Sequence, residues 1–173
     1  MKREPIKVPF LQKTKDSDYA DSLAIFKLIL RFMNDDTLTD RKEQMLGDYI
    51  AYKGLANEKL RDEILCQLVN QTWRNEVQAN NEKGWLLMAN CLSAFPPSPS
   101  LYKFLLKYVS DYGHNGYKAI CQRKLLQSHN LWARSYPACL LEWKANRKKV
   151  NMGLQVRTRD RVCIRGSTTT YAF

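Results

Sequence analysis

The chain has 173 residues, 45% of them apolar, and carries 28 Lys and Arg against 17 Asp and Glu, a net charge of +11. This length and apolar content fit one globular domain, or one domain with a fragment of a second, and seven Gly and six Pro exclude a fibrous or low-complexity chain. Five cysteines, none at C-x-x-C spacing, argue against a disulfide framework and predict a reducing compartment.

Basic residues are concentrated in the second half of the chain. Residues 1–80 carry 13 basic and 13 acidic side chains, whereas residues 81–173 carry 15 and 4. This asymmetry predicts a positive field over one half of the molecule, which would attract an acidic partner. The alternative is a solvated surface whose net charge only maintains solubility.

The first predicted helix covers residues 21–34, where apolar side chains recur at helical spacing and form a face wide enough for a nearly buried helix. Two charges within its apolar run, Lys27 and Arg31, argue against a membrane span. The polar residues at the N-terminus predict no secretory signal.

A second helix is predicted to start at Asp40 and to stop at Gly54, because Asp40 and Glu43 form a D-x-x-E capping pattern. Asn57 is a suitable cap for a third helix. A polar stretch, residues 74–81, separates this helix from a fourth over residues 85–95.

Prolines at 96, 97 and 99 predict an extended connection, after which Ser100 can cap a helix over residues 101–112. Leu101, Phe104, Leu105, Tyr108 and Val109 form the apolar stripe of this helix. Gly113 ends it, and residues 116–127 and 137–148 supply two more helices.

The pattern changes to a period of two after Val150. Leu154 and Val156 alternate with polar residues, and Val162 and Ile164 do so again after a polar stretch, which outlines a hairpin. An isolated hairpin is marginal in water. These strands therefore pack against the helices or begin a second domain.

The sequence carries no motif typical of an enzyme, a cofactor site or a metal site. No phosphate-binding glycine loop is present, and the two histidines, His114 and His129, stand far apart in sequence without a further ligand at metal spacing. Cys121 and His129 could be combined into a nucleophilic Cys–His pair. A small cysteine on a buried helix face is far more common than a catalytic one, so Cys121 is interpreted as a core residue. The acids at 58, 62 and 63 are interpreted as a solvated helix surface with local ion pairs.

Two blocks of sequence carry a resemblance. One is residues 60–72, LRDEILCQLVNQT, and the other runs from EKGWLLM at residue 82 to FPPS at residue 98. They closely resemble the signature of the myosin tail homology 4 (MyTH4) domain, found in tails of unconventional myosins and of some plant kinesins. The resemblance covers roughly residues 3–150. The segments GYK at residue 116, CQ at residue 121 and LLQ at residue 125, followed by LEW at residue 141, look most like class-fifteen myosins.

The resemblance implies an all-α fold, a compact bundle of about six helices over residues 1–150. In this family the domain stands directly before a FERM domain, so residues 151–173, a short β-like extension, are interpreted as the truncated start of its ubiquitin-like lobe. The signature blocks are expected to be structural, and Arg61 with Asp62 or Glu63 is expected to tie neighbouring helices together. The predicted core residues are Leu60, Ile64, Leu68 and Trp85.

The expected function is that of a non-catalytic adaptor in a motor tail, located in the cytoplasm on the cytoskeleton, with actin-based protrusions as a candidate site. The basic half would hold an acidic segment of a cargo or scaffold protein, or a microtubule. The alternative is a nucleic-acid or anionic-membrane binder, which the missing basic–aromatic motif disfavours. The predicted partner-binding residues are Lys103, Lys107, Lys118, Arg123, Lys124, Lys144, Arg147, Lys148 and Lys149. Reversing the charge of the cluster at 147–149 is expected to weaken binding and barely change the melting temperature.

The C-terminal residues Tyr171, Ala172 and Phe173 allow three interpretations. They form an arbitrary end, or they pair with the strands near Val156 and Ile164. In the third interpretation, the tail is a ligand whose carboxylate a PDZ domain captures.

Overall fold

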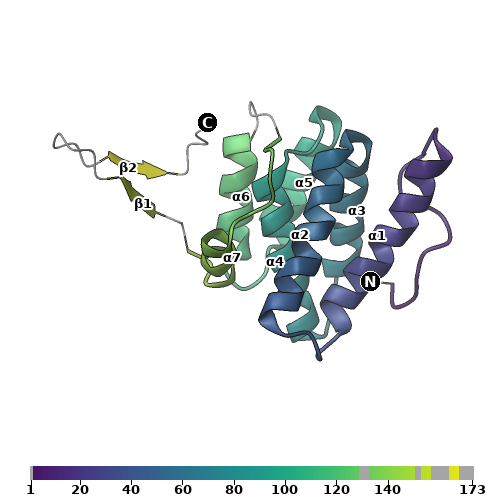
Figure 1. Cartoon of the computed structure of the whole chain (residues 1–173), viewed down its shortest axis with the longest axis horizontal. Helices are drawn as coiled ribbons and strands as arrows, with labels where there is room; N and C mark the ends of the chain where they lie inside the picture. The colour runs from purple at the N-terminus through teal and green to yellow at the C-terminus, as the bar shows by residue number, and fades with distance from the viewer. Residues whose placement is uncertain (1, 129–132, 151–152, 157–163, 168–173) are drawn as a thin grey trace.

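The computed structural model describes residues 2–128, 133–150, 153–156 and 164–167 (Figure 1). Seven α-helices and a short 3-10 turn precede two short strands. The elements are α1 (Asp16–Asn34), α2 (Asp40–Ala56), η1 (Glu58–Leu60), α3 (Arg61–Thr72), α4 (Gln78–Ala94), α5 (Pro99–Tyr112), α6 (Tyr117–Ser128), α7 (Leu140–Arg147), β1 (Gly153–Val156) and β2 (Ile164–Ser167). The helical patterns in the sequence therefore predicted the elements in their order, and the helix count is one above the six that the resemblance implied.

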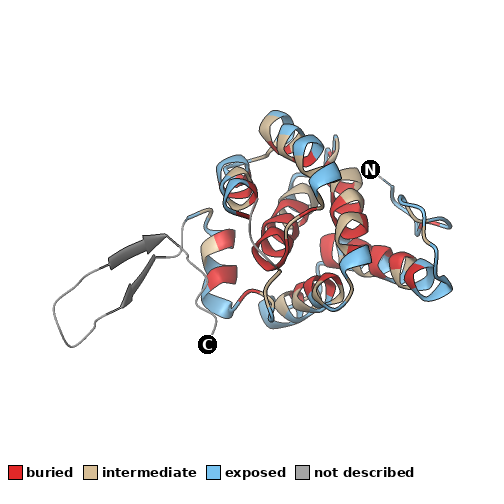
Figure 2. Ribbon diagram, turned by 90° about the horizontal axis from the view of Figure 1, so that it is seen from above, coloured by how far each residue is buried: buried red, intermediate tan, exposed pale blue. Residues whose placement is uncertain are grey.

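Helix α4 is the centre of the bundle. It packs against α1, α2, α3, α6 and α7, and every residue from Gly84 to Ala94 is buried. The outward faces of the surrounding helices are exposed (Figure 2). The four predicted core residues Leu60, Ile64, Leu68 and Trp85 have no exposed surface, which confirms the prediction.

Helix starts differ from the predictions because the first turns are polar and exposed, and periodicity detects only the apolar part of a helix. Thus α1 begins at Asp16 and α4 at Gln78. The caps also shift by one or two residues: the Thr39 hydroxyl accepts from the Lys42 amide in α2, and Ser98 caps α5, whose first residue is a proline.

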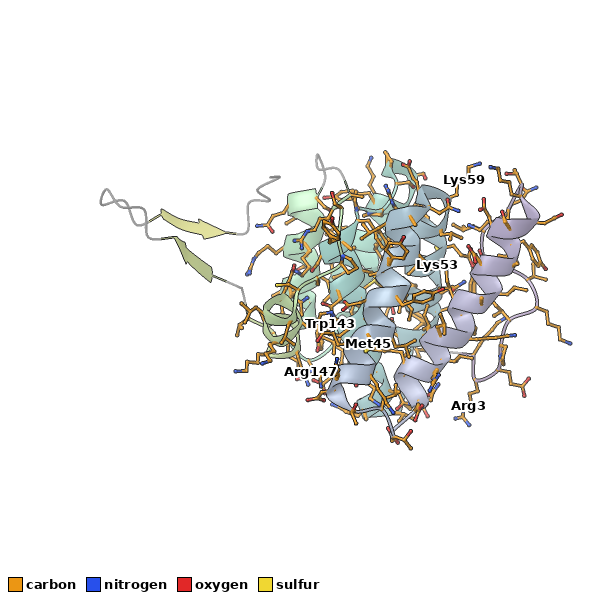
Figure 3. The ribbon with its side chains drawn as sticks, in the orientation of Figure 1. Arg3, Met45, Lys53, Lys59, Trp143 and Arg147 are labelled. Atoms are coloured by element: carbon orange, nitrogen blue, oxygen red, sulfur yellow. The ribbon has the colours of Figure 1, made fainter. Side chains whose placement is uncertain are left out.

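Helix α7 is held on the bundle by Trp143. Its ring covers Gly47 of α2, where an added Cβ would lie 2.5 Å from a ring carbon, and its indole nitrogen donates to the Asp48 carboxylate at 2.7 Å. Burial raises the pKa of the Asp48 carboxyl group. Figure 3 shows Trp143 and Arg147 beside α2.

Strands β1 and β2 pair antiparallel, with Leu154 opposite Gly166 and Val156 opposite Ile164. The connecting residues and the C-terminal tail, with Tyr171, Ala172 and Phe173, lie outside the described residues. In the part of the chain that the structure describes, no helix has the length and apolar character needed to cross a membrane.

Candidate protein-binding surface

The two acids of the first signature block accept hydrogen bonds from backbone amides. The interpretation of Asp62 and Glu63 as solvated surface was therefore wrong. Asp62 accepts from the Ser98 amide at 2.8 Å and from its hydroxyl at 2.5 Å, which fixes the proline connection before α5. Arg61 donates its Nε to the Gly54 carbonyl at 2.9 Å, which ties α3 to the end of α2. The prediction that this block ties neighbouring elements together is confirmed.

Glu63 binds the N-terminal segment although it has no exposed surface. Its two carboxylate oxygens accept the amides of Phe10 and Leu11 at 2.9 and 2.8 Å, and Gln67 adds a third hydrogen bond at 2.8 Å. A buried carboxylate requires such partners, because an unpaired one would be strongly disfavoured. Glu63 therefore fixes the path of a segment that is distant from it in sequence.

The signature blocks also line a surface cleft of about 260 Å³ at the start of α5. Its walls include Arg61, Asp62, Tyr102 and the prolines at 96, 97 and 99. The charged groups of the cleft are engaged within the fold, since Asp62 holds Ser98 and Arg61 binds Gly54 and lies 3.7 Å from Glu58. We therefore interpret this cleft as a consequence of the loop geometry.

Seven of the nine predicted partner-binding residues have exposed side chains. One of them, Arg147, is paired with acids of α2. The other six are Lys103 and Lys107 on α5, Lys118 and Arg123 on α6, Lys144 on α7, and Lys148 directly after α7. Lys107 pairs with Asp111 at 2.9 Å along the same exposed face, and Asp111 is the single acidic residue in α5 and α6. These six residues are called the basic surface below.

Lys124 does not belong to this surface. Its side chain is 17% exposed, and its ammonium donates to the Ser93 hydroxyl at 2.6 Å and lies 3.7 Å from Glu142. Burial lowers the pKa of Lys124, and Glu142 opposes this effect. Glu142 also pairs with Arg134 at 2.7 Å. The prediction for Lys124 was wrong because its charge joins α6 to α4 and α7.

Arg147 and Lys149 are also engaged within the fold. Arg147 lies 2.6 Å from the Glu43 carboxylate, and Lys149 pairs with Glu82 and lies 5.2 Å from the centre of the Tyr117 ring. The expectation that reversing the charges of residues 147–149 would barely change the melting temperature is therefore not supported by these contacts.

Helices α5 and α6 pack against each other. The Gln122 amide donates to the Ser110 hydroxyl at 2.8 Å, and a Cβ added to Gly113 would meet the Lys118 backbone at 2.6 Å. Three large hydrophobic side chains are exposed on these helices, Phe104 at 74%, Leu126 at 62% and Tyr112 at 49%. Of the apolar stripe expected on α5, Leu105 and Val109 occupy the inward face, whereas Phe104 is exposed.

Buried thiols are poor nucleophiles here. Burial raises the pKa of Cys121 to about 12, and the side chain has no exposed surface, which confirms its predicted role as a small core residue. His129 lies outside the described residues. Within the described ranges, no group of three His, Cys, Asp or Glu side chains is placed to hold a metal ion.

Comparison with known proteins identifies the family. The model of the MyTH4 domain matches residues 47–145. The chain is 48% identical to unconventional myosin-XV of Homo sapiens over 159 residues, and 38% identical to human unconventional myosin-XVB over 166 residues. These matches cover 88% and 92% of this chain but only 4% and 5% of the two myosins.

Solved structures show the same fold. The MyTH4-FERM MF1 domain of Dictyostelium discoideum myosin VII matches with a TM-score of 0.81 and 24% identity, over 90% of this chain and 34% of that one. The C-terminal MyTH4-FERM domain of human myosin 7b, in complex with the harmonin-a PDZ3 domain, matches with a TM-score of 0.79 and 24% identity, over 90% and 33%. The predicted resemblance, including that to class fifteen, is confirmed: the chain belongs to the MyTH4 domain family of unconventional myosins.

Proposed function

We propose that this domain is a non-catalytic protein-binding module of a myosin tail, which holds an acidic segment of a partner on the basic surface. The observation that carries the proposal is the set of exposed cations on α5 and α6. Asp111 is the single acidic residue in these two helices, so their net charge is strongly positive. A complex of the related human myosin 7b domain with a PDZ domain supports a role in protein binding.

The basic surface offers both long-range attraction and a short-range contact. Exposed cations steer an acidic segment and raise its association rate, whereas affinity needs desolvated apolar contact as well. Phe104, between Lys103 and Lys107 in sequence, provides such a contact because it is 74% exposed. An acidic segment with one bulky apolar side chain fits this chemistry better than a uniformly acidic one.

The family context supports two further parts of the proposal. The matched solved structures contain MyTH4 together with FERM, which supports residues 151–173 as the beginning of a FERM lobe. The relatives are unconventional myosins, which supports a cytoplasmic, cytoskeleton-associated location, with actin-based protrusions as one candidate.

Binding of three labelled probes at low and physiological salt tests the proposed partner class. The probes are an acidic peptide with one central Leu, polymerised tubulin and duplex DNA. The double variant Lys103→Glu/Lys107→Glu should weaken peptide binding about tenfold at low salt, with a smaller difference at higher ionic strength. Phe104→Ser should weaken binding of this peptide but not of a peptide in which Ser replaces the Leu.

Lys27→Glu/Lys42→Glu is the matched control, because it makes the same change in net charge at exposed positions on α1 and α2. Equal losses in the two double variants would contradict a specific site on α5. Tighter binding to DNA than to either acidic protein probe would favour the nucleic-acid alternative.

A further inference from the structure

The first residues of the chain form a strap across α1 and α3. The strap, residues 2–15, is attached along its length: the Lys2 carbonyl accepts from Gln71, Ile6 is buried against Phe26 and Leu30, and Glu63 holds the Phe10 and Leu11 amides. Near its end, Lys13 donates to the Lys59 carbonyl at 2.8 Å. These attachments hold the strap in one conformation on the bundle.

Apolar side chains of the strap and of the first turns of α1 are exposed to solvent over part of their surface. Val8 is 66% exposed, Phe10 38% and Leu11 36%, and Tyr19, whose hydroxyl donates to the Lys7 carbonyl at 2.7 Å, is 37% exposed. Exposed apolar groups that gather on one short segment mark an interaction site more often than scattered ones do.

The strap is also basic, a feature that the neutral total of residues 1–80 conceals. Residues 2–15 contain five basic side chains and one acidic side chain, Glu4. Four of the strap cations are exposed: Lys2, Arg3, Lys7 and Lys15. Lys59 in η1 is exposed as well. The side chain of Lys13 is buried, and its ammonium lies 4.0 Å from the Glu63 carboxylate. Figure 3 shows Arg3 and Lys59 on the side of the molecule that carries α1. The exposed acids that lie nearest in sequence to these cations are Glu4 and Asp16, beside the strap cations, and Glu58, beside Lys59.

We propose that the strap docks on an anionic lipid surface, with Val8, Phe10 and Leu11 entering the headgroup region and the surrounding cations contacting lipid phosphates and carboxylates. Each Lys or Arg close to an anionic leaflet is attracted by it, and long cationic side chains can extend toward the headgroups while apolar neighbours go deeper. A bilayer suits this patch because a bilayer requires no complementary pocket, whereas a specific protein partner does. The inference is independent of the proposed protein-binding function, because α1 and α6 lie at opposite ends of the bundle (Figure 1).

Vesicle co-sedimentation of the full 173-residue chain tests the proposal. Vesicles of phosphatidylcholine and phosphatidylserine, mixed two to one, are compared with vesicles of phosphatidylcholine alone. Lys7→Glu/Lys15→Glu should reduce partition to the anionic vesicles at least about tenfold, and Val8→Ser should reduce it about threefold. These side chains are exposed, so all variants should keep the wild-type melting temperature.

A charge-matched control is needed because a protein of net charge +11 is attracted to any anionic surface. Lys118→Glu/Arg123→Glu on α6 makes the same change in net charge and should leave partition within about twofold of wild type. Three results would overturn the proposal: equal losses in the two double variants, no loss with Val8→Ser, or no preference of the wild type for anionic vesicles. Loss of peptide binding in the α6 variant would bear only on the protein-binding proposal.

Discussion

The guanidinium of Arg147 lies 2.6 Å from the carboxylate of Glu43 and joins the end of α7 to α2. The Glu43 side chain is only 7% exposed, so loss of Arg147 would remove a close partner from a buried carboxylate. Asp40, also on α2, adds a second contact to Arg147 at 3.4 Å. A cation that sequence alone assigns to partner binding therefore stabilises the fold.

Arg147→Glu should destabilise the domain by about 1–3 kcal/mol, because it leaves Glu43 without its partner and places a second negative charge beside it. The side chain of Arg147 is 45% exposed, so solvent screening keeps the loss below that of a fully buried pair. Urea unfolding measures the effect. Lys148→Glu, one residue along at an exposed position, is the control and should change stability by less than about 0.5 kcal/mol. Equal stability of the two variants would show that the Glu43 contact contributes nothing.

Glu63→Gln should release the N-terminal strap. A neutral amide offers one oxygen and a competing N–H₂ group to the Phe10 and Leu11 amides, so at least one of the two hydrogen bonds is lost. We expect a loss of about 1–3 kcal/mol in the free energy of unfolding, with faster hydrogen exchange at those two amides. The control is Glu58→Gln, whose side chain is 85% exposed. Unchanged exchange in Glu63→Gln would argue against the carboxylate as the anchor.

The fold could be predicted from apolar spacing because the core is continuous along α3 and α4. Ile64 and Leu68 stand one helical turn apart on α3, and Trp85 lies in the buried part of α4. The role of Glu63 could not be predicted, because its partners are backbone amides of a segment distant in sequence. A charge in a helical sequence carries no sign of whether it faces water or another segment.

The partner-binding site stays a prediction, and sequence could indicate the exposure of its residues only in part. The charge asymmetry pointed to the second half of the chain, where Lys103, Lys118 and Lys144 are exposed. Sequence could not identify which cations are paired, because the carboxylate beside Lys124 belongs to Glu142 on another helix, α7. The neutral total charge of residues 1–80 also concealed the local excess of positive charge in the strap, residues 2–15.

Gly47→Ala should destabilise the domain although alanine is the better helix former. The gain in helix propensity is about 1 kcal/mol, but the new Cβ would lie 2.5 Å from a carbon of the Trp143 ring, which the Asp48 hydrogen bond holds in place. Overpacking of this kind costs about 1–3 kcal/mol, so the net change should be destabilising. Met45→Ala, on the exposed side of the same helix, should have a small effect on thermal unfolding. A stabilised Gly47→Ala protein would mean that Trp143 moves away freely.

Leu68→Ala should cost about 2–5 kcal/mol, because the side chain is fully buried and its removal leaves a cavity. Equilibrium denaturation at constant m-value measures the loss. The control is Leu126→Ala on α6, where the side chain is 62% exposed. A loss at Leu68 no larger than that of an ordinary surface substitution, about 0.5 kcal/mol, would show that the signature face is not packed as described.

Thiol accessibility should separate Cys139 from the other described cysteines. Cys139 is exposed, whereas Cys91 and Cys121 are buried and Cys66 is partly buried. Burial raises the pKa of Cys66 to about 11, with a further contribution from the charges of Glu63 and Asp62. At pH 8 its reactive thiolate is therefore roughly one part in a thousand, against roughly a quarter for an ordinary thiol.

In a Cys163→Ser background, which removes the cysteine that lies outside the described residues, a disulfide reagent at pH 8 should modify one thiol per chain rapidly. Cys91 and Cys121 should react only as the protein unfolds, with a rate that rises with urea, and Cys66 should react slowly at pH 8. Adding Cys139→Ser should abolish the rapid phase. Raising the pH toward 11 should increase the rate at Cys66, because its thiolate fraction then approaches one half. A rapid phase that persists at pH 8 without Cys139 would show that a thiol assigned to the packed bundle is open to solvent.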